Sequence, residues 1–584
     1  MACSPMAVSF KLRIARAALC VSTALMVTAL AMPPASAQQQ RQPRVGNMGS
    51  SSGSYLAGRF AGKMNDYNQG ADFVDQALMR DPTNPLLMFQ AFRLRLAAGR
   101  MAQAVELAPK VAVAVPGDPL PNLVLALDAV RKKDFAAAEQ SLAHLPSDPR
   151  LGFLRPYLVA WVKAGQKDYA AAQASLESAG IGGDNAATYK TSSLYLLHSG
   201  LIDELAGKKD DAKKKLQDAY DAPDAASLRV AMTLASFYRR NGNAEDAKKV
   251  MTQLYEKSGE FVPLDALLND KNSRLTTAAD GMAEVLFDVF IALAQGSNDN
   301  EQLDDAAVIF GRLTLQMRPD FDLAKLLLGD LMAQQQHMDV ALQTYRTVEA
   351  SSPMYWRARL KTAAALDDLG NTDEAVKVLE AMIGERKERA DAAQSLGDML
   401  RAKEKFVDAV KAYDIAIQRT PKPEKRNWTL FYARGIVLER SKQWAKAETD
   451  FRKALELAPD QPYVLNYLGY SWIDQGINLD EGKQMLEKAL KLKPNDGAII
   501  DSLGWANYRL GDIPRAVDLL ERAVALVSTD WTVNDHLGDA YWRVGRKLEA
   551  KFQWQRALAL KPDADKIAEI EEKISSGLAE ASKK

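Results

Sequence analysis

Residues 465–524 decide the fold, and they read LNYLGYSWIDQGINLDEGKQMLEKALKLKPNDGAIIDSLGWANYRLGDIPRAVDLLERAV. Gly469 and Gly504 stand 35 residues apart, and a second small residue, Gly482 or Ala516, follows each of them after twelve or thirteen positions. Two helices whose backbones approach closely need side chains no larger than a methyl group where they cross. The stretch therefore predicts two consecutive pairs of packed helices.

The same period runs through nearly the whole chain. We use the word anchor for the position in the first helix of each unit that is small in most units. The anchors are Gly58, Phe92, Ala126, Ala160, Gly200, Ala235, Ala294, Gly329, Ala363, Gly397, Gly435, Gly469, Gly504 and Gly538. Most successive anchors lie 34 or 35 residues apart, and the largest gap separates Ala235 from Ala294. A period of this length is typical of stacked two-helix repeats, so the sequence predicts an all-α solenoid of about 14 repeats.

Two further positions recur with the anchors. About four residues after the second small residue lies a larger apolar one, which we expect to fill the space between neighbouring units: Tyr345, Tyr413, Phe451, Leu520 and Trp554. A glycine lies seven residues after several anchors, where the turn between paired helices calls for a positive φ: Gly99, Gly207, Gly242, Gly370, Gly476, Gly511 and Gly545.

The N-terminus has the pattern of an export signal. A basic region precedes an apolar segment from Ala17 to Ala31, and Ala35-Ser36-Ala37 forms a small-x-small cleavage site. We therefore expect a cleaved signal peptide at residues 1–37. The alternative is that this segment is not cleaved and attaches the chain to the membrane. Residues 38–53 are polar and rich in Gly, Ser and Gln, which predicts a flexible leader.

The rest of the chain divides where the period lapses. We predict an N-terminal repeat array at residues 54–258, an irregular joint at 259–300, a C-terminal repeat array at 301–570 and a charged tail at 571–584. No stretch outside the N-terminus approaches the roughly 18 apolar residues of a membrane helix, so no integral span is expected after cleavage of the signal.

Charge and cysteine content exclude several kinds of site. Removing the first 37 residues deletes three basic residues and no acidic one, leaving 72 basic against 75 acidic residues. A chain without basic excess is a poor nucleic-acid binder. The two cysteines, Cys3 and Cys20, both lie in the predicted signal peptide, so the mature chain has no disulfide.

The sequence offers no catalytic, cofactor or metal motif. The four histidines have no metal-binding spacing, and neither a phosphate-binding glycine loop nor a GxSxG elbow occurs. We therefore expect a protein that is not an enzyme and that needs no cofactor.

A binding surface is predicted instead on the first helices of the last three units. The repeats resemble those of the tetratricopeptide-repeat family, and this resemblance implies that residues three before, one after and four after the anchor line a concave groove. The candidate groove residues are Asn466, Tyr470, Asp501, Trp505, Tyr508, Asp535, Asp539 and Trp542, with Arg509 and Arg543 beside them. Aromatic rings flanked by hydrogen-bonding groups suit an extended peptide. The alternative is that these rings pack between units.

Residues 465–524, together with VNDHLGDAYWRVGRKLEAKFQWQRAL at 533–558, resemble the tetratricopeptide-repeat (TPR) family. The TPR resemblance implies a right-handed superhelix. Within the family they are similar to exported envelope proteins of Gram-negative bacteria. Some members of that group are outer-membrane lipoproteins that bring a carboxyl-terminal processing protease together with its cell-wall-hydrolase substrates. Cys20 lies inside the apolar run and follows Leu19, so the chain departs from the lipoprotein pattern.

The resemblance implies a periplasmic adaptor that presents partner proteins or extended peptides on its concave face, free in the periplasm or peripheral to the outer membrane. The protease and the cell-wall hydrolases are the partners that it suggests. A second hypothesis is a structural or assembly component of an envelope polysaccharide or secretion complex. A third is an enzyme with a domain that the motifs do not reveal.

Overall fold

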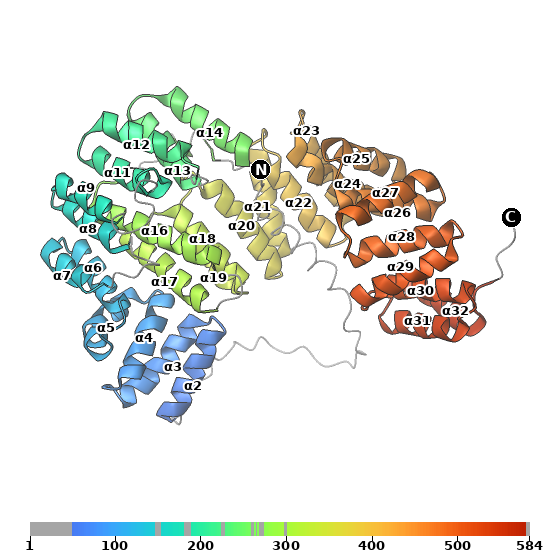
Figure 1. The fold of residues 1–584 in the computed structure, drawn as a ribbon, viewed down its shortest axis with the longest axis horizontal. Helices are drawn as coiled ribbons and strands as arrows, with labels where there is room; N and C mark the ends of the chain where they lie inside the picture. Colours follow the sequence, from blue (N-terminus) through green and yellow to red (C-terminus); the bar gives the residue numbers. More distant parts are fainter. Residues whose placement is uncertain are drawn as a thin grey trace. The chain divides into compact units, whose positions relative to one another are not determined.

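A computed structural model describes residues 50–145, 154–179, 189–223, 228–258, 262–263, 266–267, 274–296 and 301–579. Within these ranges the chain forms 29 α-helices and one 3-10 helix, and no strand occurs among them (Figure 1). The all-α prediction is confirmed. The predicted signal peptide and residues 38–49 of the predicted leader lie outside the described ranges.

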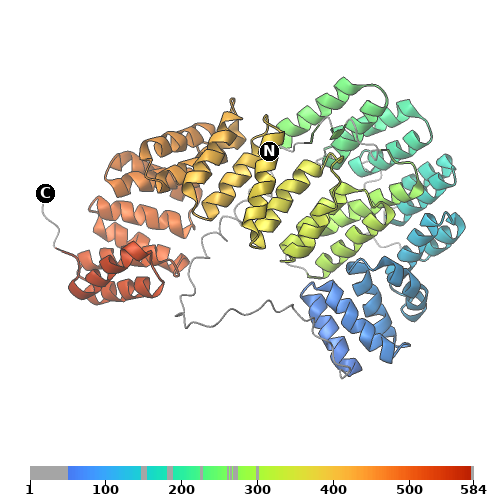
Figure 2. The ribbon, with the colours of Figure 1, turned by 180° about the vertical axis from the view of Figure 1, so that it is seen from behind.

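The helices belong to two compact units, one within residues 37–378 and one within residues 379–584. In each unit, consecutive helices lie antiparallel in pairs (Figures 1 and 2). The division between the units falls inside α21 (Thr372–Glu385).

The first unit contains α2 (Ser51–Lys63), α3 (Tyr67–Arg80), α4 (Pro85–Ala97), α5 (Met101–Ala114), α6 (Leu120–Arg131), α7 (Phe135–Ala143), α8 (Leu154–Gly165), α9 (Tyr169–Ser178), α11 (Ser193–Leu205), α12 (Lys209–Asp221), α13 (Leu228–Arg240), α14 (Ala244–Ser258), α16 (Ala278–Gly296), α17 (Glu301–Met317), α18 (Asp322–Gln334), α19 (Met338–Arg346) and α20 (Tyr355–Asp368).

The second unit contains α22 (Asp391–Ala402), α23 (Phe406–Gln418), η2 (Lys425–Asn427), α24 (Trp428–Arg440), α25 (Trp444–Leu457), α26 (Pro462–Gln475), α27 (Leu479–Leu492), α28 (Gly497–Arg509), α29 (Ile513–Leu526), α30 (Trp531–Arg543), α31 (Lys547–Ala559) and α32 (Ala564–Ser576).

The turn inside each pair has a fixed backbone geometry. All seven glycines predicted to have positive φ have it, with values from 71° at Gly476 to 89° at Gly511. In other helix pairs the same position, seven residues after the anchor, holds a residue that is not glycine but has a left-handed backbone: Asn65, Lys133, Lys167, Gln336, Glu404 and Lys442. The turn therefore keeps its shape even where an L side chain opposes it.

The anchors are small because a large side chain of the paired helix packs over them. A Cβ atom added to Gly435 would lie 2.6 Å from the ring of Phe451, and one added to Gly397 would lie 2.7 Å from the ring of Tyr413. Both rings are fully buried. The recurrent large residue therefore fills the space inside its own helix pair. It also packs against the next pair, as predicted, since the ring centroids of Phe451 and Tyr467 on α26 lie 5.1 Å apart.

The prediction that Ala294 is an anchor is wrong. Ala294 is only half-buried near the end of α16, and the helix pair α16–α17 packs instead with Phe290 against Gly311, where an added Cβ would lie 3.0 Å from the ring. The pair is longer than the others, with 19 and 17 residues, so the repeat spacing does not locate its crossing point.

The predicted joint at residues 259–300 contains a central helix of the first unit. Most of α16 is buried, and it packs against α6 and α8 as well as α17, while α17 also contacts α4. Because α16 and α17 pack against α4, α6 and α8, residues 54–258 share one compact unit with helices α17 to α20.

Both predicted ends of the repeat region differ slightly from the structure. Within the described ranges, the first helix is α2, which begins at Ser51, inside the predicted leader, because the Ser50 side chain caps it by accepting from the Gly53 amide. The last helix, α32, continues to Ser576, inside the predicted charged tail, because Ile570 and Lys573 are buried against the preceding pair. No helix in the described part of the chain is long and apolar enough to cross a membrane.

Candidate protein-binding surface

The predicted groove residues of the second unit lie on three first helices, α26, α28 and α30. The structure does not arrange them as one open row. It brings some of them into two buried clusters and leaves a smaller group near solvent.

The first cluster surrounds Trp505. Its indole lies between the rings of Tyr508 and His536, with centroid distances of 4.8 Å and 4.1 Å and nearly parallel planes. The Nε1 atom of Trp505 is buried without a hydrogen-bond partner. The surroundings of this ring are therefore those of a residue packed between neighbouring repeats, and not those of a ring exposed in a groove.

Asp501 orients His536 in the same cluster. The Nδ1 atom of His536 lies 3.0 Å from Oδ1 of Asp501, and both side chains are almost fully buried. Burial alone would lower the pKa of His536, but the carboxylates of Asp501, Asp535 and Asp539 together outweigh burial, and the pKa is raised. His536 was not among the predicted groove residues, because it lies two positions before its anchor.

The second cluster joins α30 to α32. The Nζ atom of Lys573 lies 2.8 Å from Asp535 and 3.0 Å from Asp539, and Asp539 also accepts from the indole nitrogen of Trp554 at 2.9 Å. Burial, followed by the charge of Asp535, raises the pKa of Asp539 to about 6. Asp535 and Asp539, two of the predicted groove residues, are therefore paired with a lysine of the same chain.

Trp542 and Arg543 contact the backbone that follows α32. The indole nitrogen of Trp542 donates to the Leu578 carbonyl at 3.2 Å, and Nη1 of Arg543 donates to the Ala579 carbonyl at 2.9 Å. These side chains thus bind the main chain of a non-helical segment of the same protein.

The remaining predicted residues lie nearer to solvent. Tyr470 is half-buried, and burial together with the charges of Asp474 and Asp501 raises its pKa, so its hydroxyl stays protonated. The exposed Arg509 donates to the Asp474 carbonyl at 3.1 Å and lies 3.8 Å from the Asp474 carboxylate. Tyr470, Asp474 and Arg509 form what we term the open patch.

Asn466 lies one helical turn before Tyr470 on α26. Its side chain is half-buried, and its Oδ1 atom is buried without a hydrogen-bond partner. An acceptor left in this state costs free energy, so Asn466 is the member of the predicted set whose role the local packing explains least.

In the first unit, the corresponding helix face is covered by α16. The Trp161 indole donates to Nδ1 of His198 at 3.1 Å, and Nε2 of His198 lies 2.9 Å from Asp288 on α16. A Cβ atom added to Gly281 of α16 would lie 1.9 Å from the Trp161 ring. The first helices α8 and α11 therefore direct these side chains to another helix of the same unit.

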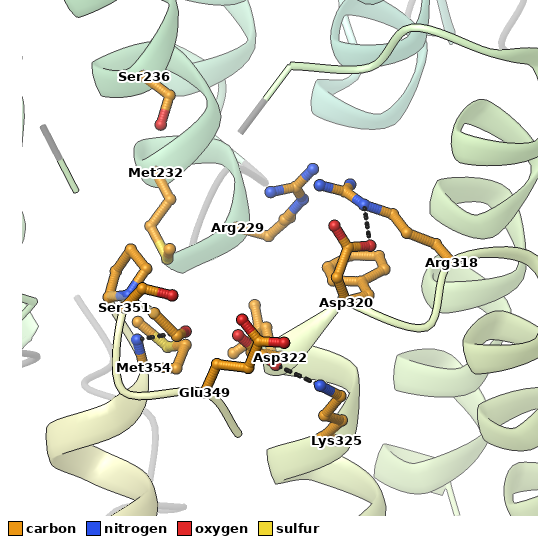
Figure 3. Close-up of a pocket in the computed structure, with 14 residues that line it drawn as sticks. Arg229, Met232, Ser236, Arg318, Asp320, Asp322, Lys325, Glu349, Ser351 and Met354 are labelled. Atoms are coloured by element: carbon orange, nitrogen blue, oxygen red, sulfur yellow. Dashed lines mark hydrogen bonds and ion pairs between the residues drawn. The ribbon is translucent and has the colours of Figure 1, made fainter. Parts of the chain in front are cut away.

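A polar pocket is lined by α13, by α18 with the loop before it, and by the loop before α20. Figure 3 shows the guanidinium groups of Arg229 and Arg318 directed toward each other, and both lie over the Phe321 ring at about 5 Å. The buried carboxylate of Glu284 forms ion pairs with both arginines. Asp322 likewise pairs with Lys325, at 2.7 Å. Because the cations have acidic partners, we interpret these groups as a structural cluster that joins α13, α16 and α18.

The described residues contain no group of three or more His, Cys, Asp or Glu side chains arranged to hold a metal ion.

Comparison with known proteins supports the repeat assignment. Two family models described as tetratricopeptide repeat match residues 360–423 and 428–461, and the second match coincides with the pair α24–α25. The TPR repeat-containing protein PA4667 of Pseudomonas aeruginosa is 30% identical over 203 residues, which are 33% of this chain and 32% of that protein.

Other similar proteins share shorter or more distant matches. Human protein O-mannosyl-transferase TMTC1 is 29% identical over 181 residues, covering 30% of this chain and 20% of that protein. The chain thus spans a third or less of these relatives. A crystal structure of the APC/C hetero-tetramer Cut9-Hcn1 aligns with 91% of this chain and 96% of that chain, at 14% identity and a TM-score of 0.38.

The matched models fall on helix pairs whose anchors, turns and packing recur in most other helix pairs of the described ranges. The chain therefore contains tetratricopeptide repeats at residues 360–423 and 428–461.

Proposed function

We propose that this chain is a non-enzymatic protein-binding scaffold of the bacterial cell envelope, which presents partner proteins or extended peptides on the first helices of its second unit. One observation carries the proposal: Trp542 and Arg543 of α30 bind the main-chain carbonyls of Leu578 and Ala579. First-helix side chains of this unit are thus able to bind the main chain of a non-helical segment, which is how a peptide ligand is held.

The open patch is the part of this surface that a partner would reach. It combines an aromatic hydroxyl, a carboxylate and a guanidinium on two adjacent first helices. Such groups supply both anchorage and register to a bound peptide. A periplasmic location is supported by the export pattern of residues 1–37, with a position peripheral to the outer membrane as its variant. The resemblance to envelope adaptors suggests a carboxyl-terminal processing protease and cell-wall hydrolases as partners.

The test is an affinity capture from bacterial envelope extract with the chain from Gln38 to Lys584. The variant Tyr470→Ala/Arg509→Ala removes the open patch, and Lys453→Ala, on the second helix α25, is the matched control. We expect the control to recover the same partners as the wild type and the patch variant to lose them. Equal recovery by both variants would contradict binding at the open patch.

A second candidate function, a structural component of an envelope assembly, has one observation in its favour. Leu56, Phe60 and Met64 follow one another at helical spacing on and just after α2, and they are 61%, 68% and 59% exposed. An apolar stripe of this kind marks an interaction site. If the variant Leu56→Ser/Phe60→Ser loses the partners while the open-patch variant keeps them, the assembly function is favoured.

A further inference from the structure

The segment that follows α32 lies against α30 and has no regular secondary structure. Gly577 ends the helix with φ 78° and ψ −178°, and the next two carbonyls accept from Trp542 and Arg543. Arg543 is held in turn by the hydroxyl of Tyr508, which accepts from its Nε atom at 3.3 Å. The contacts to residues 578 and 579 are made to main-chain atoms, which every peptide carries.

Two features of the segment add sequence preference. A Cβ atom on Gly577 would lie 1.9 Å from the Trp542 ring, so this position accepts glycine alone. Leu578 packs against the apolar cluster that contains Tyr541 and Trp554. The surface therefore selects a glycine followed by an aliphatic residue.

The segment is held separately from α32 itself. Lys573 fixes α32 through Asp535 and Asp539, and Ile570 is buried in the same apolar cluster. Residues 577–579 can therefore leave the surface while α32 stays in place.

We propose that the surface formed by Tyr508, Trp542 and Arg543 is a docking site for an extended protein segment with a glycine followed by an aliphatic residue, and that Gly577-Leu578-Ala579 occupies it until such a partner displaces it. This inference rests on the proposed function, because it names the kind of peptide that the second unit would bind and the segment of the chain that would compete with that peptide. It makes the C-terminal segment a built-in regulator of binding.

The experiment measures binding of a fluorescent peptide with the sequence of residues 574–582, ISSGLAEAS. Fluorescence anisotropy compares the chain from Gln38 to Lys584 with the same chain ending at Ser576. We expect the shortened chain to bind the peptide and the full chain to bind at least about tenfold more weakly, because its site is open only part of the time. In the shortened chain, Trp542→Ala should abolish binding.

A peptide with the Gly577→Val change is the matched control and should not bind the shortened chain. Circular dichroism and melting curves verify that the shortened chain remains folded. Failure of the folded, shortened chain to bind the peptide would overturn the inference, as would equal binding of the valine peptide. Envelope partners captured through the open patch would in that case leave the proposed function standing, so the two failures are distinguishable.

Discussion

Tyr413 donates its hydroxyl to Oδ1 of Asp398 at 2.8 Å, while its ring packs over Gly397, the residue directly before that aspartate. The same relationship, with donor and acceptor 15 residues apart, recurs between Tyr345 and Asp330 at 2.7 Å and between Trp554 and Asp539 at 2.9 Å. In these repeats the residue after the anchor therefore satisfies the polar end of the ring that covers the anchor. The pair fixes the crossing of the two helices both sterically and by a hydrogen bond.

Tyr413→Phe tests the hydrogen bond alone. The variant keeps the buried ring and removes its donor, so we expect a loss of about 0.5–1.5 kcal/mol in the free energy of unfolding. Tyr413→Ala also opens a cavity over Gly397 and should cost about 3–5 kcal/mol. Urea denaturation measures both variants, and an equal loss in the two would mean that the ring contributes nothing beyond its hydroxyl.

Gly435→Ala tests the steric requirement of the anchor. The added methyl group would meet the Phe451 ring at 2.6 Å, so we expect overpacking to cost about 1–3 kcal/mol of stability. Gly384→Ala is the control, because this glycine lies in α21 with no atom within 4 Å of an added Cβ. Alanine favours helix over glycine, so the control should be neutral or more stable by up to about 1 kcal/mol. A melting temperature unchanged by Gly435→Ala would contradict the packing described for this pair.

The anchors and the turn glycines could be predicted from the sequence because both repeat at a fixed local distance. The left-handed residues such as Lys133 and Glu404 could not, because a charged residue at that position carries no turn signal of its own. The Ala294 anchor was predicted wrongly because the crossing of α16 and α17 depends on a glycine, Gly311, outside the repeat spacing, while the end of α16 around Ala294 is only partly buried.

The candidate site was predicted in part. The positions around each anchor identified Trp505, Asp539 and Trp542 as first-helix residues facing a common surface, but not what covers them. His536 and Lys573 cover them through contacts 34 to 38 residues away in sequence. The repeat period predicts which helices are neighbours, but not which of their side chains contact one another. The open patch around Tyr470 and Arg509 is the part of the prediction that stays nearest to solvent.

The His536–Asp501 pair predicts a pH dependence of stability. Since the pKa of His536 is raised in the folded state, its protonated form stabilises the fold fully below the unfolded pKa of about 6.5, and this contribution is lost as pH rises through the folded pKa. We expect the melting temperature of the wild type to fall relative to that of His536→Gln between about pH 6 and pH 9, because glutamine does not titrate. A constant difference over this range would contradict the pairing.

Glu284 provides the sharpest test of the packing of α16 onto the first unit. It is 1% exposed and pairs with both Arg229 and Arg318, so Glu284→Gln leaves two largely buried guanidinium groups without their shared carboxylate. Breaking a buried ion pair from one side typically costs about 3–5 kcal/mol. We expect faster hydrogen–deuterium exchange in α13 and α16 and a lower melting temperature. Glu349→Gln is the matched control: Glu349 lines the same pocket but is exposed, so its substitution should change stability by less than about 0.5 kcal/mol. If both variants exchange like the wild type, the carboxylate of Glu284 does not hold α16 in place, and the covering of the first helices must rest on apolar contacts such as Gly281 with Trp161.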